Sequence, residues 1–171
     1  MTYKEALHKE MLQLASNPKV RFVGYNTKCG PQMNGTLKGC EASCIEMPVA
    51  ENLMVGVAIG LALNGFLPVL CFERMDFMLA AADALFNHVG KLQHYGLTIP
   101  IIIRACVGND HPLDPGWQHK QDYSPLFSYE PSIVSVRVLT VRGVQFYYGL
   151  AQGCKQPLLL TEYKELYEAT D

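Results

Sequence analysis

Two spacings of apolar residues divide this chain of 171 residues into segments. Apolar side chains recur at helical spacing in residues 4–15, 75–95 and 141–153, which predicts three amphipathic helices. An apolar run rich in Gly and Ala, which Glu51 opens, predicts a buried helix at residues 51–63. Short apolar runs bounded by Gly, Pro or Asn predict strands at residues 20–23, 69–72, 99–104, 133–138 and 158–161.

Helices and strands alternate in this prediction, which indicates an α/β fold with a three-layer parallel sheet and helices on both faces. At this length we expect residues 1–171 to form a single domain. Ligands of such sheets bind beyond the carboxyl ends of the strands. We therefore expect the segments that follow the first three strands to share one edge, where they bring together Asn26, residues 73–77, His111 and His119.

Composition fits a compact α/β protein, with 49% hydrophobic and 18% charged residues. A net charge of −2 and a pI near 6.2 give no electrostatic reason to expect nucleic acid or an acidic membrane as a partner. The uncharged residues 52–72 are long enough to span a membrane, but Asn64-Gly65 and Pro68 divide them into pieces that are too short. Residues 1–16 show no signal-peptide pattern, so we expect a cytoplasmic protein.

The six cysteines are expected to be reduced thiols, because no secretory signal accompanies them. Cys40 and Cys44, with Cys29 upstream, are candidates for a metal site. They lack a second close pair and a nearby His, so we favour ordinary thiols over zinc ligands.

The most informative stretch is Met47 to Phe77, MPVAENLMVGVAIGLALNGFLPVLCFERMDF. It resembles the pyrimidine-binding domain of thiamine-diphosphate enzymes, most closely the beta subunit of the 2-oxoacid dehydrogenases and more distantly transketolase. The resemblance extends from Thr2 to Glu162, and further matching features are Asn87-His88, Lys91-Leu92 and Gln118-His119. Those proteins continue into a C-terminal domain, for which we expect no counterpart here.

The resemblance implies a site. Its catalytic residues are Glu51, which shares a proton with a ring nitrogen of the coenzyme's aminopyrimidine, and His119, which passes protons or holds the intermediate. Its cofactor-binding residues are Glu51, Leu53, Glu73 and Phe77, with Phe77 stacking on the pyrimidine. Under the resemblance, His111 is the alternative to His119. Without the resemblance, Glu51 is a helix-start acid favoured by the dipole, Phe77 a core residue and His119 a solvated loop imidazole.

Two features near this site have more than one interpretation. Glu73 stands where the family often has Met or Gln, and the neighbouring Arg74 is expected to pair with Glu73 or with a substrate carboxylate. The segment from Gly56 to Gly60 resembles the family's contact in which small residues let helices of different subunits approach closely. Without the resemblance, the two glycines predict a close helix crossing inside the chain.

The sequence contains no Gly-Asp-Gly motif, with which the family binds diphosphate and magnesium on a separate domain. The resemblance therefore implies that thiamine diphosphate and Mg²⁺ are held largely by an alpha-like partner subunit, in a hetero-oligomer of two alpha-like and two beta-like subunits. It implies a split enzyme that makes or breaks a carbon–carbon bond next to a carbonyl, by 2-oxoacid decarboxylation of the dehydrogenase type or by ketol transfer of the transketolase type. The alternatives are a non-catalytic regulatory or scaffold subunit of such an enzyme and a stand-alone small-molecule sensor.

Overall fold

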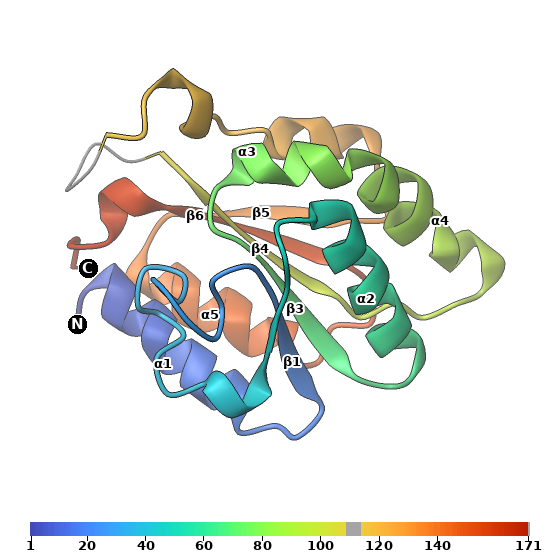
Figure 1. The fold of residues 1–171 in the computed structure, drawn as a ribbon, viewed down its shortest axis with the longest axis horizontal. Helices are drawn as coiled ribbons and strands as arrows, with labels where there is room; N and C mark the ends of the chain where they lie inside the picture. Colours follow the sequence, from blue (N-terminus) through green and yellow to red (C-terminus); the bar gives the residue numbers. More distant parts are fainter. Residues whose placement is uncertain (109–113, 171) are drawn as a thin grey trace.

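The computed structural model describes residues 1–108 and 114–170. Within these residues, six parallel strands form one sheet in the order β2-β1-β3-β4-β6-β5 (Figure 1). Every strand pair is parallel, as the alternation of helices and strands predicted. The strands are β1 (Val20–Gly24), β2 (Cys44–Glu46), β3 (Leu67–Phe72), β4 (Ile102–Val107), β5 (Val134–Val138) and β6 (Leu158–Tyr163).

Helices cover both faces of the sheet, and each face has its own core (Figure 1). Helices α1 (Tyr3–Ala15) and α5 (Val141–Ala151) lie side by side on one face, and α2 (Glu51–Leu63) and the helical residues 75–95 lie on the other. Side chains of a strand alternate between the faces, so that Val69 and Cys71 of β3 enter the first core while Leu70 and Phe72 enter the second. This arrangement confirms the predicted three-layer α/β fold.

The strands differ from the prediction in several places. β3 begins at Leu67 rather than at residue 69, and β6 extends to Tyr163 rather than to residue 161. The sequence analysis missed β2, because three residues at the edge of a sheet leave no periodic pattern. It also placed the strand that follows β3 at residues 99–104, whereas β4 spans Ile102–Val107. Pro100 explains the delay, since a proline has no N–H group for the ladder of hydrogen bonds.

Residues 75–95 are helical, but they do not form the single regular helix that their spacing predicts. They contain α3 (Met75–Met78), a π-helical turn (Ala84–Val89) and α4 (Gly90–Leu92), with 3₁₀ turns between and after them. Leu79, one of the apolar residues that recur at helical spacing in this segment, is 43% exposed, and the preceding Met78 is buried. A π turn contains more residues than an α turn, so a face extrapolated at α spacing drifts by one position.

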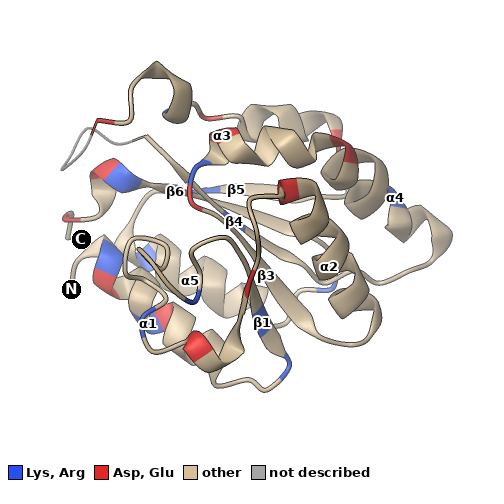
Figure 2. Cartoon of the chain, viewed as in Figure 1, with Lys and Arg blue, Asp and Glu red and all other residues tan. Residues whose placement is uncertain are grey.

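Helix α2 is apolar throughout but buries only one of its sides. Met54, Val55, Ala58 and Ala62 are buried, whereas Leu53 and Leu63 are 52% and 50% exposed. Figure 2 shows no charged residue on α2 beyond its first turn. The prediction of a buried helix was therefore wrong for this outer side. In the described part of the chain, no helix has the length and hydrophobicity needed to cross a membrane.

Candidate functional site

The carboxyl ends of the central strands meet at one edge of the sheet. Tyr25 directly follows β1, Glu73 follows β3 and Gly108 follows β4. Glu51, the first residue of α2, reaches the same edge, because it lines a pocket together with Tyr25 and Glu73. This is the edge at which parallel α/β sheets bind ligands.

The pocket is a cavity of about 140 Å³ with mainly apolar and aromatic walls and two carboxylates. It brings together three of the residues predicted to bind a cofactor, namely Glu51, Glu73 and Phe77. Leu53 is not in the lining, and its half-exposed side chain leaves its cofactor role a prediction. The full lining is Tyr25, Val49, Glu51, Met54, Cys71, Phe72, Glu73 and Phe77.

Glu51 is partly buried in the first turn of α2. The side chain of Ala50, the residue before it, caps none of the N–H groups at this end of the helix. The helix dipole favours a carboxylate here by about 0.3–1 kcal/mol. The Glu51 carboxylate forms no hydrogen bond or ion pair with any residue that the structure describes, so it is available to a ligand in the pocket.

Arg74 turns away from its neighbour Glu73. Its Nη1 donates hydrogen bonds to the carbonyl oxygens of Gly108, at 2.9 Å, and His119, at 3.4 Å. The expected pairing of Arg74 with Glu73 is therefore wrong. The guanidinium instead ties the segment that carries His119 to the end of β4.

His119 reaches the pocket through Phe77. The two rings meet edge to face, with their centroids 5.1 Å apart and an angle of 63° between their planes. The Nδ1 atom of His119 is buried and has no hydrogen-bond partner among the described residues. An unpartnered buried nitrogen beside a pocket favours a functional imidazole over a merely solvated one.

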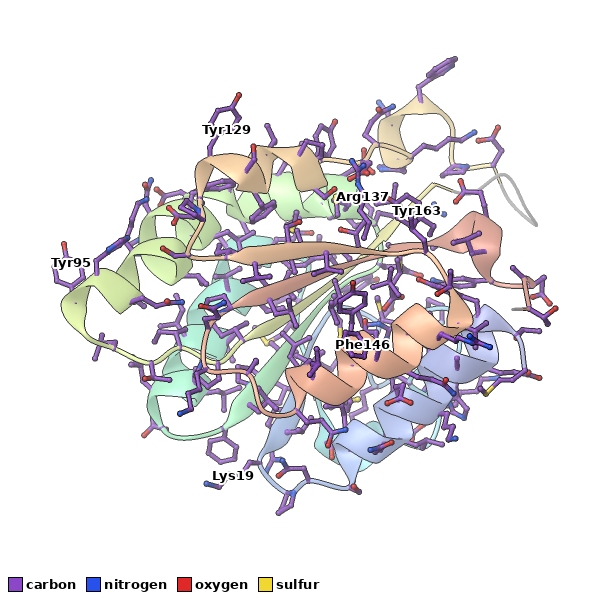
Figure 3. All side chains as sticks on the ribbon, turned by 180° about the vertical axis from the view of Figure 1, so that it is seen from behind. Lys19, Tyr95, Tyr129, Arg137, Phe146 and Tyr163 are labelled. Carbon is purple, nitrogen blue, oxygen red and sulfur yellow. The ribbon has the colours of Figure 1, made fainter. Side chains whose placement is uncertain are left out.

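Asp122 anchors the segment that carries His119. Its carboxylate accepts a hydrogen bond from the Tyr163 hydroxyl at 2.8 Å and pairs with the Arg137 guanidinium at 3.0 Å. Figure 3 shows Arg137 and Tyr163 close together, on β5 and β6. Burial works against ionisation of Asp122, but hydrogen bonds from Ser124 and Tyr163 and the charge of Arg137 outweigh it and lower its pKa. The carboxylate therefore stays charged and holds the segment near neutral pH.

The sequence analysis missed most of the apolar walls of the pocket. Val49, Met54 and Phe72 carry no chemical signal and reach the pocket through packing. Tyr25 had a usable signal, because it directly follows the first strand at the predicted edge. His111 lies outside the described residues.

The cysteines show no sign of metal chemistry. All six are free thiols. Burial raises the pKa of Cys40 to about 11 and that of Cys44 to about 12, so neither is a thiolate near neutral pH. Among the residues that the structure describes, no group of three or more His, Cys, Asp or Glu side chains is arranged to hold a metal ion.

Gly56 and Gly60 lie on the outer side of α2. A Cβ atom at either position would meet nothing within 4 Å. A close helix crossing within the described part of the chain, the interpretation from spacing alone, is therefore wrong. With Leu53 and Leu63, the two glycines form an exposed and uncharged side that we call the α2 outer face.

Comparison with known proteins identifies the family. The sequence matches the family "Transketolase, pyrimidine binding domain" over residues 1–168. It is 32% identical over 178 residues to "Pyruvate dehydrogenase E1 component subunit beta" of Staurastrum punctulatum, a match that covers 96% of this chain and 51% of the relative. It is 31% identical over 184 residues to "Acetoin:2,6-dichlorophenolindophenol oxidoreductase subunit beta" of Cupriavidus necator, covering 98% of this chain and 53% of the relative.

The chain spans about half the length of these curated relatives. Among solved structures, "Split gene transketolase, inactive beta4 tetramer" aligns with a TM-score of 0.74 at 18% identity, covering 96% of this chain and 52% of that one. This likeness shows a shared fold. The family match extends over almost the whole chain and includes the pocket residues. The chain belongs to the transketolase pyrimidine-binding domain family.

Proposed function

We propose that this chain is the beta-like subunit of a thiamine-diphosphate-dependent enzyme that makes or breaks a carbon–carbon bond next to a carbonyl group. The observation that carries the proposal is the pocket in which Glu51 and Phe77 meet at the carboxyl edge of the sheet. The names of the relatives support chemistry of the 2-oxoacid dehydrogenase or the transketolase type.

The residues of the pocket fit the pyrimidine half of this coenzyme. The aromatic side chains of Tyr25, Phe72 and Phe77 suit a flat ring. Glu51 and Glu73, which have no hydrogen-bond or ion-pair partner among the described residues, leave two carboxyl groups for the nitrogen atoms of such a ring. When bound, thiamine diphosphate supplies a nucleophilic carbon that attacks a carbonyl group.

Each residue then has a distinct role. We assign to Glu51 the role of sharing a proton with a ring nitrogen of the aminopyrimidine. Phe77 packs against the ring and also contacts His119. The Nδ1 atom of His119, buried and unpartnered among the described residues, is available to take up or release a proton beside the pocket.

An alpha-like partner subunit supplies the diphosphate and Mg²⁺ site in this proposal, in an assembly of two alpha-like and two beta-like subunits. The α2 outer face supports such a partner, because it is apolar and has room for close approach at Gly56 and Gly60. Each of these glycines costs about 1 kcal/mol relative to Ala in a helix interior. Close packing against another subunit would offset that cost.

The test is Glu51→Gln in the assembled complex. General acid–base catalysis contributes typically about 10²–10⁴-fold, so turnover should fall by at least about 10²-fold while the subunits still assemble. Glu168→Gln, at an exposed position, is the control and should leave turnover unchanged. Full turnover in the Glu51 variant would contradict an enzymatic role for this pocket and favour a scaffold subunit.

A further inference from the structure

We propose that Glu73 determines which ring the pocket accepts, by accepting a hydrogen bond from the exocyclic amino group of an aminopyrimidine. This inference rests on the proposed function, because it takes the pyrimidine half of the coenzyme as the ligand. It adds a second polar contact, from this chain, to the one assigned to Glu51.

Glu73 is a pocket carboxylate without a bonded partner. It follows β3, lines the pocket beside Glu51, and forms no hydrogen bond or ion pair within the described part of the chain. Two basic side chains that could pair with it donate hydrogen bonds to other groups: the adjacent Arg74 to the Gly108 carbonyl at 2.9 Å, and the buried Lys164 to Asn34 Oδ1 at 3.3 Å. The charge of Glu73 reaches Lys164 only through space.

A carboxylate in such a pocket requires a donor from the ligand. An ionised carboxylate only accepts hydrogen bonds, and covering it with an apolar ring surface would remove its water without replacement. Besides its two ring nitrogens, which are acceptors, an aminopyrimidine has one exocyclic amino group, which is a donor. Glu51 is assigned to a ring nitrogen, so the amino group is the donor that remains for Glu73.

The choice between an amino and an oxo group follows from this contact. An oxygen at the same ring position would face the Glu73 carboxylate with a lone pair, so the contact would become repulsive. Hydrogen bonds to charged groups are strong enough that their loss reduces affinity by about tenfold or more. We therefore expect the pocket to bind the 4-amino ring at least about tenfold more tightly than the 4-oxo ring.

The experiment titrates the full chain with 4-amino-5-hydroxymethyl-2-methylpyrimidine and with its 4-hydroxy counterpart, followed by NMR. Glu73→Met should bring the two affinities to within about threefold, because the acceptor is gone. Glu73→Gln keeps an acceptor oxygen and should retain part of the preference. Glu51→Gln should weaken the binding of both rings without changing the ratio of their affinities. Glu168→Gln, the control, should leave both affinities unchanged. Circular dichroism verifies that each variant is folded.

Equal affinity of the unmodified chain for the two rings would overturn the inference, as would an unchanged ratio in Glu73→Met. A lack of saturable binding of the amino ring would overturn it as well. The outcome is separable from that of the proposed function, which depends on turnover in Glu51→Gln. If turnover of the complex depends on Glu51 but the chain shows no preference between the rings, the proposed function stands and this inference fails. If the chain prefers the amino ring but turnover does not depend on Glu51, this inference stands and the proposed function fails.

Discussion

Replacing Glu162 with Gln should destabilise the fold strongly, because Glu162 is the counter-charge of a fully buried arginine. Both Arg104 and Glu162 have side chains that are 0% exposed, and they are joined by Nε–Oε1 at 2.5 Å and Nη2–Oε2 at 3.0 Å. The Tyr148 hydroxyl also donates to Glu162, and the Cys106 thiol lies 3.5 Å from Oε2. Arg104 in turn donates to Thr36 Oγ1 at 2.7 Å, which ties the loop after β1 to the sheet.

The size of the effect follows from what remains after the substitution. Removing one member of a buried ion pair costs about 3–5 kcal/mol, because the other charge is left without compensation. Arg104 cannot replace the lost contact with another one, because its Nη1 is already buried and unpartnered among the described residues. Arg104→Met should cost about 3 kcal/mol, at the lower end of this range, because Glu162 keeps its hydrogen bond from the Tyr148 hydroxyl. A domain is stable by only about 5–15 kcal/mol in total, so either loss is large.

The assay is urea unfolding followed by circular dichroism, with a double-mutant cycle. The double variant Arg104→Met/Glu162→Gln should be more stable than the sum of the single losses predicts, by about 1 kcal/mol or more, since it leaves no lone charge. Asp83→Asn is the control: Asp83 pairs with His88 at 3.6 Å on the surface, and its loss should cost less than about 1 kcal/mol. A loss below 1 kcal/mol for Glu162→Gln, or strictly additive losses, would refute the reasoning.

Three further predictions concern the site and its surroundings. Phe77→Ala should weaken coenzyme binding to the assembled complex by about 0.5–1.5 kcal/mol or more, measured by calorimetry, and an unchanged affinity would exclude ring contact. Gly56→Ala should stabilise the isolated chain by up to about 1 kcal/mol, because the added Cβ has open space. The same variant should weaken association with the partner in sedimentation experiments, and unimpaired association would exclude the α2 outer face as the contact surface. Burial opposes ionisation of Glu46, but hydrogen bonds from the N–H groups of Lys28 and Asn26 outweigh this effect and lower the pKa of Glu46. The stability that the ionised Glu46 contributes is therefore present above the ordinary pKa of Glu and is lost as the pH falls through the lowered pKa. Exchange of the Lys28 and Asn26 amides, corrected for intrinsic rates, should accelerate in that acid range, and Glu46→Gln should abolish the step.

The agreement between sequence and structure is greatest where short-range pattern decides. The bounds of α2 match the prediction, because Glu51 starts an uninterrupted apolar run and Asn64-Gly65 ends it. The carboxyl edge was also predictable, since alternating helices and strands leave little choice but a parallel sheet. The π-helical turn at Ala84–Val89 was not, because local spacing does not reveal where packing inserts an additional residue into a turn.

The sequence by itself determined the α/β class, the edge that carries the site, and three of the residues that line the pocket, Glu51, Glu73 and Phe77. Only the tertiary structure decided that Arg74 points to Gly108 and that Arg104 is buried against Glu162, 58 positions away. Such contacts depend on distances between remote parts of the chain, on which residue spacing carries no information. The same holds for α2, whose uniformly apolar sequence cannot distinguish its buried side from its exposed one, because only the neighbouring elements define a side.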